Sequence, residues 1–140
     1  MKKKLLISAC LLGVPCRYDG RSKPSEAAVA LSEQYELIPF CPECYGGLPT
    51  PRPPAEICGE RVVTREGKDV TAEYTRGAES ALALCQALKI KDACLKAKSP
   101  SCGNREIYDG TFSGTRVSGE GITVRLLKKH GIRVFSEEDL

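Results

Sequence analysis

The stretch Lys4-Leu5-Leu6-Ile7-Ser8-Ala9, with the loop, helix and strand that follow it, decides the fold class. Its short, apolar character and its β-favouring residues predict a buried strand. Cys10 to Arg21 contains glycine, proline and an Asp-Gly pair, which are typical of a loop. Lys23-Pro24-Ser25-Glu26 predicts the start of a helix, with proline in its first turn. Glu36 to Phe40 predicts a second strand, so the chain opens with a β-α-β unit.

The alternation of strands and helices continues after the second predicted strand. Ile57 to Val70 alternates around Glu66-Gly67-Lys68, which predicts a hairpin. Further elements are predicted at Thr71–Leu88 (helix), Ala93–Ala97 (strand), Ile122–His130 (helix, closed by Gly131) and Ile132–Phe135 (strand). This order predicts one α/β domain over residues 1–140, with a mostly parallel sheet, helices on both faces and a β-hairpin insertion.

Composition and charge narrow the functional classes. The chain has 140 residues and a net charge of +3, which is too weak to indicate nucleic-acid binding. The apolar run from Leu5 to Ala9 is too short for a signal-peptide core or a membrane span. We therefore expect a cytoplasmic protein with no membrane anchor and no nucleic-acid partner.

Cysteine is unusually abundant, with eight residues in the chain. In a small secreted protein this number would indicate disulfides, but no export signal is apparent. A reducing cytosol favours metal binding or thiol chemistry instead. Thiolates are soft ligands, which select zinc, Cu(I) or iron–sulfur clusters.

Three cysteines follow predicted strands. Cys10 ends the first strand, Cys41 ends the second, and Cys102 lies in the loop after the third. In a parallel sheet the carboxyl ends of the strands share one edge, and neighbouring strands are about 4.7–4.9 Å apart. Ligands of such sheets bind beyond that edge. The three thiolates are therefore expected to surround a cluster a few ångströms wide.

The other cysteines have simpler interpretations or leave alternatives open. Cys85 falls on the apolar stripe of a helix and Cys94 within a strand, as small buried hydrophobic residues do. Cys58 has no evident partner. Cys16 and Cys44 share the loops of Cys10 and Cys41, so each is a candidate fourth ligand or redox partner. Cys41-Pro42-Glu43-Cys44 is a C-x-x-C motif, which suits zinc or thiol exchange, but the second motif of many zinc sites is missing.

Several motifs together resemble a known family. They are Ser8-Ala9-Cys10-Leu11-Leu12-Gly13, Cys16-Arg17-Tyr18-Asp19-Gly20, Cys41-Pro42-Glu43, Gly46-Gly47-Leu48-Pro49-Thr50-Pro51-Arg52-Pro53-Pro54-Ala55-Glu56 and Ser99-Pro100-Ser101-Cys102-Gly103. Over nearly its whole length the chain is similar to the thiouracil desulfurases.

The resemblance implies a single Rossmann-like domain that holds a [4Fe–4S] cluster on Cys10, Cys41 and Cys102, with one iron lacking a protein ligand. It also implies non-redox desulfuration of a thiolated pyrimidine, such as 2-thiouracil or a 4-thiouracil or 4-thiouridine compound, with release of sulfide. It assigns Glu43 and Ser101 to the chemistry. Without the resemblance, the residues alone would favour a solvated loop carboxylate for Glu43 and a turn or helix-cap residue for Ser101.

Arg17, Asp19 and Arg52 lie in the same loops and are candidate substrate-binding residues. They suit recognition of a pyrimidine ring or a phosphate, and they suit a structural ion pair equally well. Other functions also remain open. The chain could be a metal- or iron–sulfur-binding accessory protein without turnover, a thiol–disulfide oxidoreductase that uses Cys41 and Cys44, or a zinc-stabilised RNA-binding module.

Overall fold

A computed structural model describes residues 2–140 of the chain. Its strands are β1 (Lys3–Ser8), β2 (Tyr35–Phe40), β3 (Ala55–Cys58), β4 (Arg61–Thr64), β5 (Asp92–Cys94), β6 (Glu106–Tyr108), β7 (Arg116–Ser118) and β8 (Arg133–Phe135). Its α-helices are α1 (Glu26–Ala30), α2 (Pro42–Tyr45), α3 (Thr71–Leu88) and α4 (Ile122–Lys129). Short 3-10 turns cover Ala9–Leu12, Leu31–Glu33 and Glu137–Asp139.

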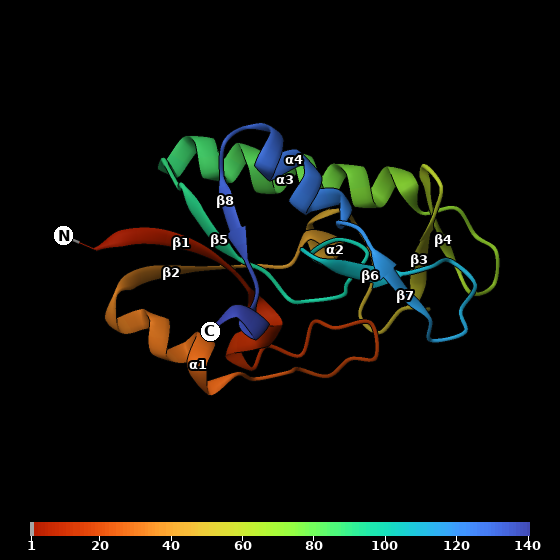
Figure 1. Cartoon of the computed structure of the whole chain (residues 1–140), viewed down its shortest axis with the longest axis horizontal. Helices are drawn as coiled ribbons and strands as arrows, with labels where there is room; N and C mark the ends of the chain where they lie inside the picture. The colour runs from red at the N-terminus through yellow and green to blue at the C-terminus, as the bar shows by residue number, and fades with distance from the viewer. Residues whose placement is uncertain (1) are drawn as a thin grey trace.

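The central sheet has the order β2-β1-β5-β8, and all its neighbouring strands are parallel. Figure 1 shows α3 and α4 side by side above this sheet, with α1 below it. One apolar cluster joins Leu6 and Leu95 to α3 and α4, and a second joins Leu5 and Ile7 to α1. The alternation of Leu5, Leu6 and Ile7 between the two clusters is the period of two that a strand imposes. The predicted α/β class, with helices on both faces of a parallel sheet, is confirmed.

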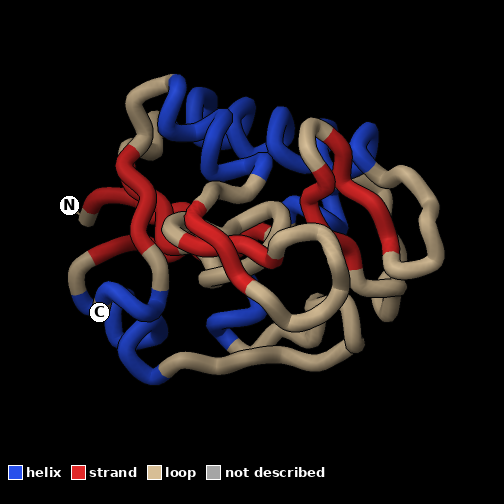
Figure 2. The backbone as a smooth tube through the Cα atoms, turned by 45° about the vertical axis from the view of Figure 1, so that its right-hand side comes forward, coloured by secondary structure: helices blue, strands red, loops and turns tan. Residues whose placement is uncertain are grey.

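Two antiparallel hairpins lie outside the central sheet, β3–β4 and β6–β7. Figure 2 shows β3–β4 on the side of the molecule away from the N-terminus and β6–β7 near the middle of the view. The predicted hairpin is present, but its placement was wrong. The paired strands turn at Gly59, whose φ of +64° suits a residue without a side chain. The expected turn at Glu66-Gly67-Lys68 forms a second, shorter reversal, closed by a bond from Thr64 N to Lys68 O (2.8 Å).

Helix α2, which begins just after Cys41, packs directly on α3. The contact depends on Gly77 in the middle of α3, because a Cβ atom there would lie 2.1 Å from the carbonyl oxygen of Pro42. Such a distance is far inside van der Waals contact, so a side chain at this position would push the two helices apart. The small size of Gly77 therefore positions the segment that carries Cys41 and Glu43.

We predict that Gly77→Ala destabilises the protein by about 1–3 kcal/mol, the usual cost of forcing atoms into a packed interior. Alanine normally stabilises a helix relative to glycine by roughly 1 kcal/mol, so the expected sign is opposite to that of helix propensity. Urea unfolding would measure the change. Thr75→Ala, at an exposed position of the same helix, is the control and should not destabilise. A Gly77→Ala variant as stable as the parent would contradict the close contact.

Candidate active site

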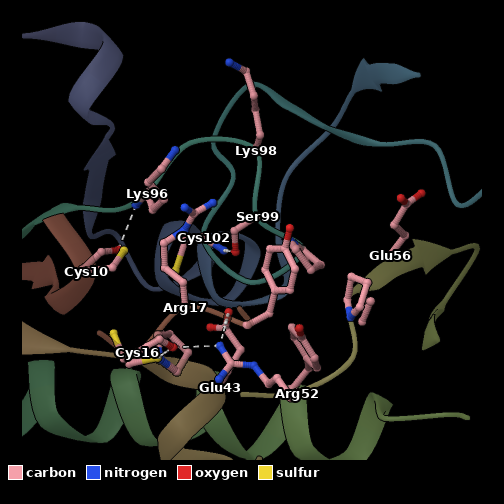
Figure 3. Close-up of a pocket in the computed structure, with 18 of the residues that line it drawn as sticks. Cys10, Cys16, Arg17, Glu43, Arg52, Glu56, Lys96, Lys98, Ser99 and Cys102 are labelled. Atoms are coloured by element: carbon pink, nitrogen blue, oxygen red, sulfur yellow. Dashed lines mark hydrogen bonds and ion pairs between the residues drawn. The ribbon is translucent and has the colours of Figure 1, made fainter. Parts of the chain in front are cut away.

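A cavity of about 360 Å³ lies beyond the carboxyl ends of β1, β2 and β5. This volume is within the range of small-molecule sites in proteins. The cavity is at the edge of the sheet where parallel α/β folds bind ligands. Figure 3 shows Cys10, Cys16 and Cys102 on one side of it, Glu43 and Arg52 along the bottom of the view, and Glu56 at the opposite end.

Cys10, Cys41 and Cys102 all line this cavity. Cys10 lies in the 3-10 turn that follows β1, and Cys41 is the residue before the first turn of α2. Cys102 follows β5 in a tight turn, in which the Ser99 hydroxyl oxygen accepts hydrogen bonds from the backbone N–H groups of Ser101 (3.0 Å) and Cys102 (2.9 Å). The three cysteines therefore meet at one edge of the sheet, as the strand order predicted, while their role as ligands stays a prediction.

The structure separates the two remaining candidate thiols. Cys16 is buried, lines the cavity and lies within hydrogen-bonding reach of both Cys10 and Cys41. Cys44 is exposed, and its Sγ lies 3.6 Å from the Thr50 hydroxyl. It is not among the residues that line the cavity. Cys16, and not Cys44, is thus the fourth thiol of the site.

The pKa values of Cys16, Cys41 and Cys102 are all raised, which favours the neutral thiol. The neighbouring Cys10 thiol and burial raise the pKa of Cys16 to about 11. The pKa of Cys41 is raised by its contact with Cys16 and by burial, and that of Cys102 by burial and by the nearby Glu43. Bound cations reverse this tendency, because they stabilise thiolates directly. The pKa values of Cys41 and Cys44 in the C-x-x-C pair are both raised, whereas thiol exchange relies on a lowered thiol pKa.

The donor set fits an iron–sulfur cluster better than a single metal ion. Within residues 2–140, no group of three or more His, Cys, Asp or Glu side chains is arranged to hold one metal ion. The tight tetrahedral geometry of a structural zinc site is therefore not formed by the described residues. Four thiols from three segments of the chain instead line a shared cavity, as suits a larger group that prefers soft ligands.

Glu43 and Arg52 form a buried ion pair at the base of the cavity. Arg52 Nη2 lies 3.5 Å from Glu43 Oε2, and their side chains are 4% and 13% exposed. The Arg52 guanidinium also donates to the carbonyl oxygens of Cys16 (3.1 Å) and Pro49 (3.2 Å) and to the Thr50 hydroxyl (3.1 Å). Figure 3 marks the contacts of Arg52 with Glu43 and Cys16 by dashed lines. A structural ion pair was one of the two roles that the sequence left open for Arg52, and this pair is present. Substrate binding by Arg52 stays a prediction.

The environment of Glu43 suits acid–base chemistry. Burial raises the pKa of the Glu43 carboxyl, and the charge of Arg52 and a hydrogen bond from Ser101 counteract this without cancelling it. A raised pKa brings a carboxyl closer to the range in which a general acid–base group works. The predicted partner Ser101 is fully buried and does not line the cavity itself.

The other predicted substrate-binding residues differ in position. Arg17 lines the cavity, with its guanidinium carbon 6.0 Å from the centre of the Tyr18 ring. Asp19 is exposed and does not line the cavity, and its carboxylate accepts a hydrogen bond from the Arg21 N–H (3.0 Å). The structure thus shows Asp19 in a turn that shapes the loop carrying Arg17, and a direct substrate contact of Asp19 stays a prediction.

Sequence reasoning missed the far wall of the cavity. Tyr108, Phe112 and Arg65 line it, with the Arg65 guanidinium 5.7 Å from the centre of the Phe112 ring. Buried Glu56 holds this wall in place by accepting hydrogen bonds from the backbone N–H groups of Gly110 (2.9 Å) and Phe112 (3.2 Å). The aromatic residues around Tyr108-Asp109-Gly110 were a usable signal, but only the packing of the two hairpins brings them to the site.

No helix among residues 2–140 combines the length and apolar character needed to cross a membrane.

Cys85 and Cys94 are 1% and 0% exposed within the core, so their expected role as buried hydrophobic residues is confirmed.

Comparison with known proteins tests the family resemblance that the motifs indicate. A family model described as 2-thiouracil desulfurase matches residues 5–139. The uncharacterized protein YbbK of Bacillus subtilis (strain 168) is 42% identical over 146 aligned residues, which cover 97% of each chain. A solved structure of the [4Fe-4S]-dependent thiouracil desulfidase TudS is 57% identical and matches with a TM-score of 0.94, covering 99% of this chain and 93% of that one. The motifs around the cavity and these matches agree, and the chain belongs to the 2-thiouracil desulfurase family.

Proposed function

We propose that this chain is a [4Fe–4S]-dependent enzyme that removes sulfur from thiouracil, giving the oxo pyrimidine and sulfide. The observation that carries the proposal is that Cys10, Cys41 and Cys102 line the same cavity as the buried acid Glu43. The family and the 57% identical thiouracil desulfidase support the substrate and the cofactor. All eight cysteines are free, as suits an enzyme of the reducing cytoplasm, where we place it.

The reaction balances without an external oxidant or reductant. Water adds to the thiocarbonyl carbon, the C–S bond breaks as a C–O bond forms, and sulfur leaves as sulfide. When bound, the cluster supplies an iron without a protein ligand, a soft Lewis acid suited to the leaving sulfur. Cys10, Cys41 and Cys102 are its proposed ligands, and their three thiolates leave that iron free.

The remaining chemistry falls to the side chains around the cavity. Glu43 accepts a proton from the attacking water and returns it to the departing sulfur or the ring. Arg52 fixes the direction of the Glu43 carboxylate through the ion pair and stabilises its charged form. We assign Ser101 to the support of this carboxylate, because it is among the groups that hold the Glu43 pKa down.

We assign recognition of the pyrimidine to the outer part of the cavity. The aromatic rings of Tyr18, Tyr108 and Phe112 line it, and such rings stack on the flat faces of a ligand ring. Arg17 supplies hydrogen-bond donors for a ring oxygen or an anionic substituent.

We predict that the anaerobically purified, cluster-loaded protein converts 2-thiouracil to uracil with one sulfide released per turnover. Chromatography of the pyrimidine and a colorimetric sulfide assay would measure both products. Protein stripped of iron by a chelator is the control and should be inactive. Parallel assays with 4-thiouracil and 4-thiouridine would show which thiocarbonyl position and which ring substituent are accepted. A fully loaded protein inactive on all three compounds would favour the accessory-protein alternative.

A further inference from the structure

Tyr74, near the start of α3, lines the cavity although it lies outside the sequence motifs that resemble the family. The residue is 4% exposed, and it packs in an apolar cluster with Val62, Val70 and Ile107. Its hydroxyl is therefore a polar group at the end of a ring that is otherwise part of the core.

The Tyr74 hydroxyl has no partner within the described chain. Among residues 2–140, Tyr35 is the only tyrosine whose hydroxyl takes part in a hydrogen bond with another protein group. In the same range, the only sealed side-chain nitrogen or oxygen atom without a partner is Asn104 Oδ1, so the Tyr74 hydroxyl keeps an open face. Because Tyr74 is otherwise packed and lines the cavity, this face is available to whatever occupies the cavity.

Two close backbone contacts hold the start of α3 against α2. A Cβ atom on Gly46 would lie 2.0 Å from the carbonyl oxygen of Glu73. A Cβ atom on Gly77 would lie 2.1 Å from the carbonyl oxygen of Pro42. Tyr74 lies between Glu73 and Gly77, three residues before Gly77, and residues at this spacing share a face of a helix. Tyr74 is thus on the face of α3 that packs on α2.

The same two contacts bracket Glu43 in α2, so the helices fix Tyr74 and Glu43 relative to each other. Figure 3 shows α3, the green helix at the bottom of the view, beneath Glu43 and Arg52. The Arg52 guanidinium is engaged by Glu43 and by three further oxygen atoms. Burial and the nearby Glu43 carboxylate raise the pKa of Tyr74, so its hydroxyl stays protonated and is a free donor at this end of the cavity.

We propose that Tyr74 is a substrate-binding residue, whose hydroxyl donates a hydrogen bond to the ring carbonyl oxygen of thiouracil, the oxygen that the reaction leaves unchanged. A carbonyl oxygen is a good acceptor, and a site built to pair with a polar group rejects analogues that lack it. Tyr74 would thus select pyrimidines that carry an oxo group as well as the thiocarbonyl. The proposal rests on the proposed function, because it names a specificity contact for that substrate. A purely structural Tyr74 would act through its ring alone.

Tyr74→Phe removes the hydroxyl and keeps the ring, so its fold and iron content should match those of the parent. We expect the Kd of the cluster-loaded protein for uracil to rise about tenfold, the effect of about one hydrogen bond. Uracil has the ring carbonyl and does not react, so calorimetry measures its binding without turnover. KM for 2-thiouracil should rise by a similar factor, with kcat within about threefold of the parent. Tyr45→Phe, at an exposed position of α2 that does not line the cavity, is the control and should change none of these values.

Two analogues with a single carbonyl group, pyrimidin-2-one and pyrimidin-4-one, locate the contact. Tyr74→Phe should weaken the binding of one of them as it weakens that of uracil, and leave the other at the parent affinity. Equal uracil affinities of parent and Tyr74→Phe, or an equal loss for all three compounds, would overturn the proposal, as would a parent protein that does not bind uracil. A loaded parent that binds uracil but releases no sulfide from any thiouracil would refute the proposed function, while calorimetry would still decide the role of Tyr74.

Discussion

Cys102→Ala is expected to lose its iron and all detectable desulfuration. Cys102 is 4% exposed and lines the cavity beside Glu43. Removing one of three thiolates leaves two irons of a [4Fe–4S] cluster without protein ligands, and such clusters depend on thiolate ligation. Iron and acid-labile sulfide per protein, together with the visible absorbance, would measure the loss.

A matched control tests whether the effect is specific to the site. Cys85→Ala removes an equally buried thiol from α3, where Cys85 packs in the apolar core. It should keep its iron and its activity, with only a modest loss of stability. Thermal unfolding of both variants would show whether Cys102→Ala is still folded. Full iron content in a folded Cys102→Ala would show that the ligand assignment is wrong.

Glu43→Gln is expected to keep the cluster and to lose on the order of 10²-fold or more in kcat, as removal of a general acid–base group does. Glutamine matches the shape of glutamate but cannot accept a proton from water. The change also leaves the Arg52 charge without its anionic partner, which should lower stability. Arg52 keeps its hydrogen bonds to Cys16, Pro49 and Thr50, so the fold should survive.

The control for this variant is Glu56→Gln, a second buried carboxylate of the same cavity. Glu56 accepts two backbone hydrogen bonds from the 110–112 segment, and a glutamine oxygen can accept them as well. Its kcat should therefore fall far less than that of Glu43→Gln. Equal rates for parent and Glu43→Gln at full iron content would assign proton transfer to water or to another group.

The local pattern of apolar residues predicted most of the strands and helices. The strands at β1, β2 and β8 and the helices α3 and α4 lie within a few residues of their expected bounds, because each carries a regular apolar period. The β6–β7 hairpin was missed. Its strands have three residues each, and the burial pattern of β7 is fully exposed, so it has no periodic signal. Cys10 lies in a 3-10 turn and not at the end of the strand.

The sequence by itself determined that Cys10, Cys41 and Cys102 meet. A repeated β-α-β order favours a parallel sheet, and parallel strands end at one edge. Only the tertiary structure decided which other groups join them. It selected Cys16 over Cys44, placed Asp19 outside the cavity, paired Arg52 with Glu43 and added Tyr74 to the cavity wall. The direction of a loop side chain depends on contacts between distant segments, and no local period in the sequence records those contacts.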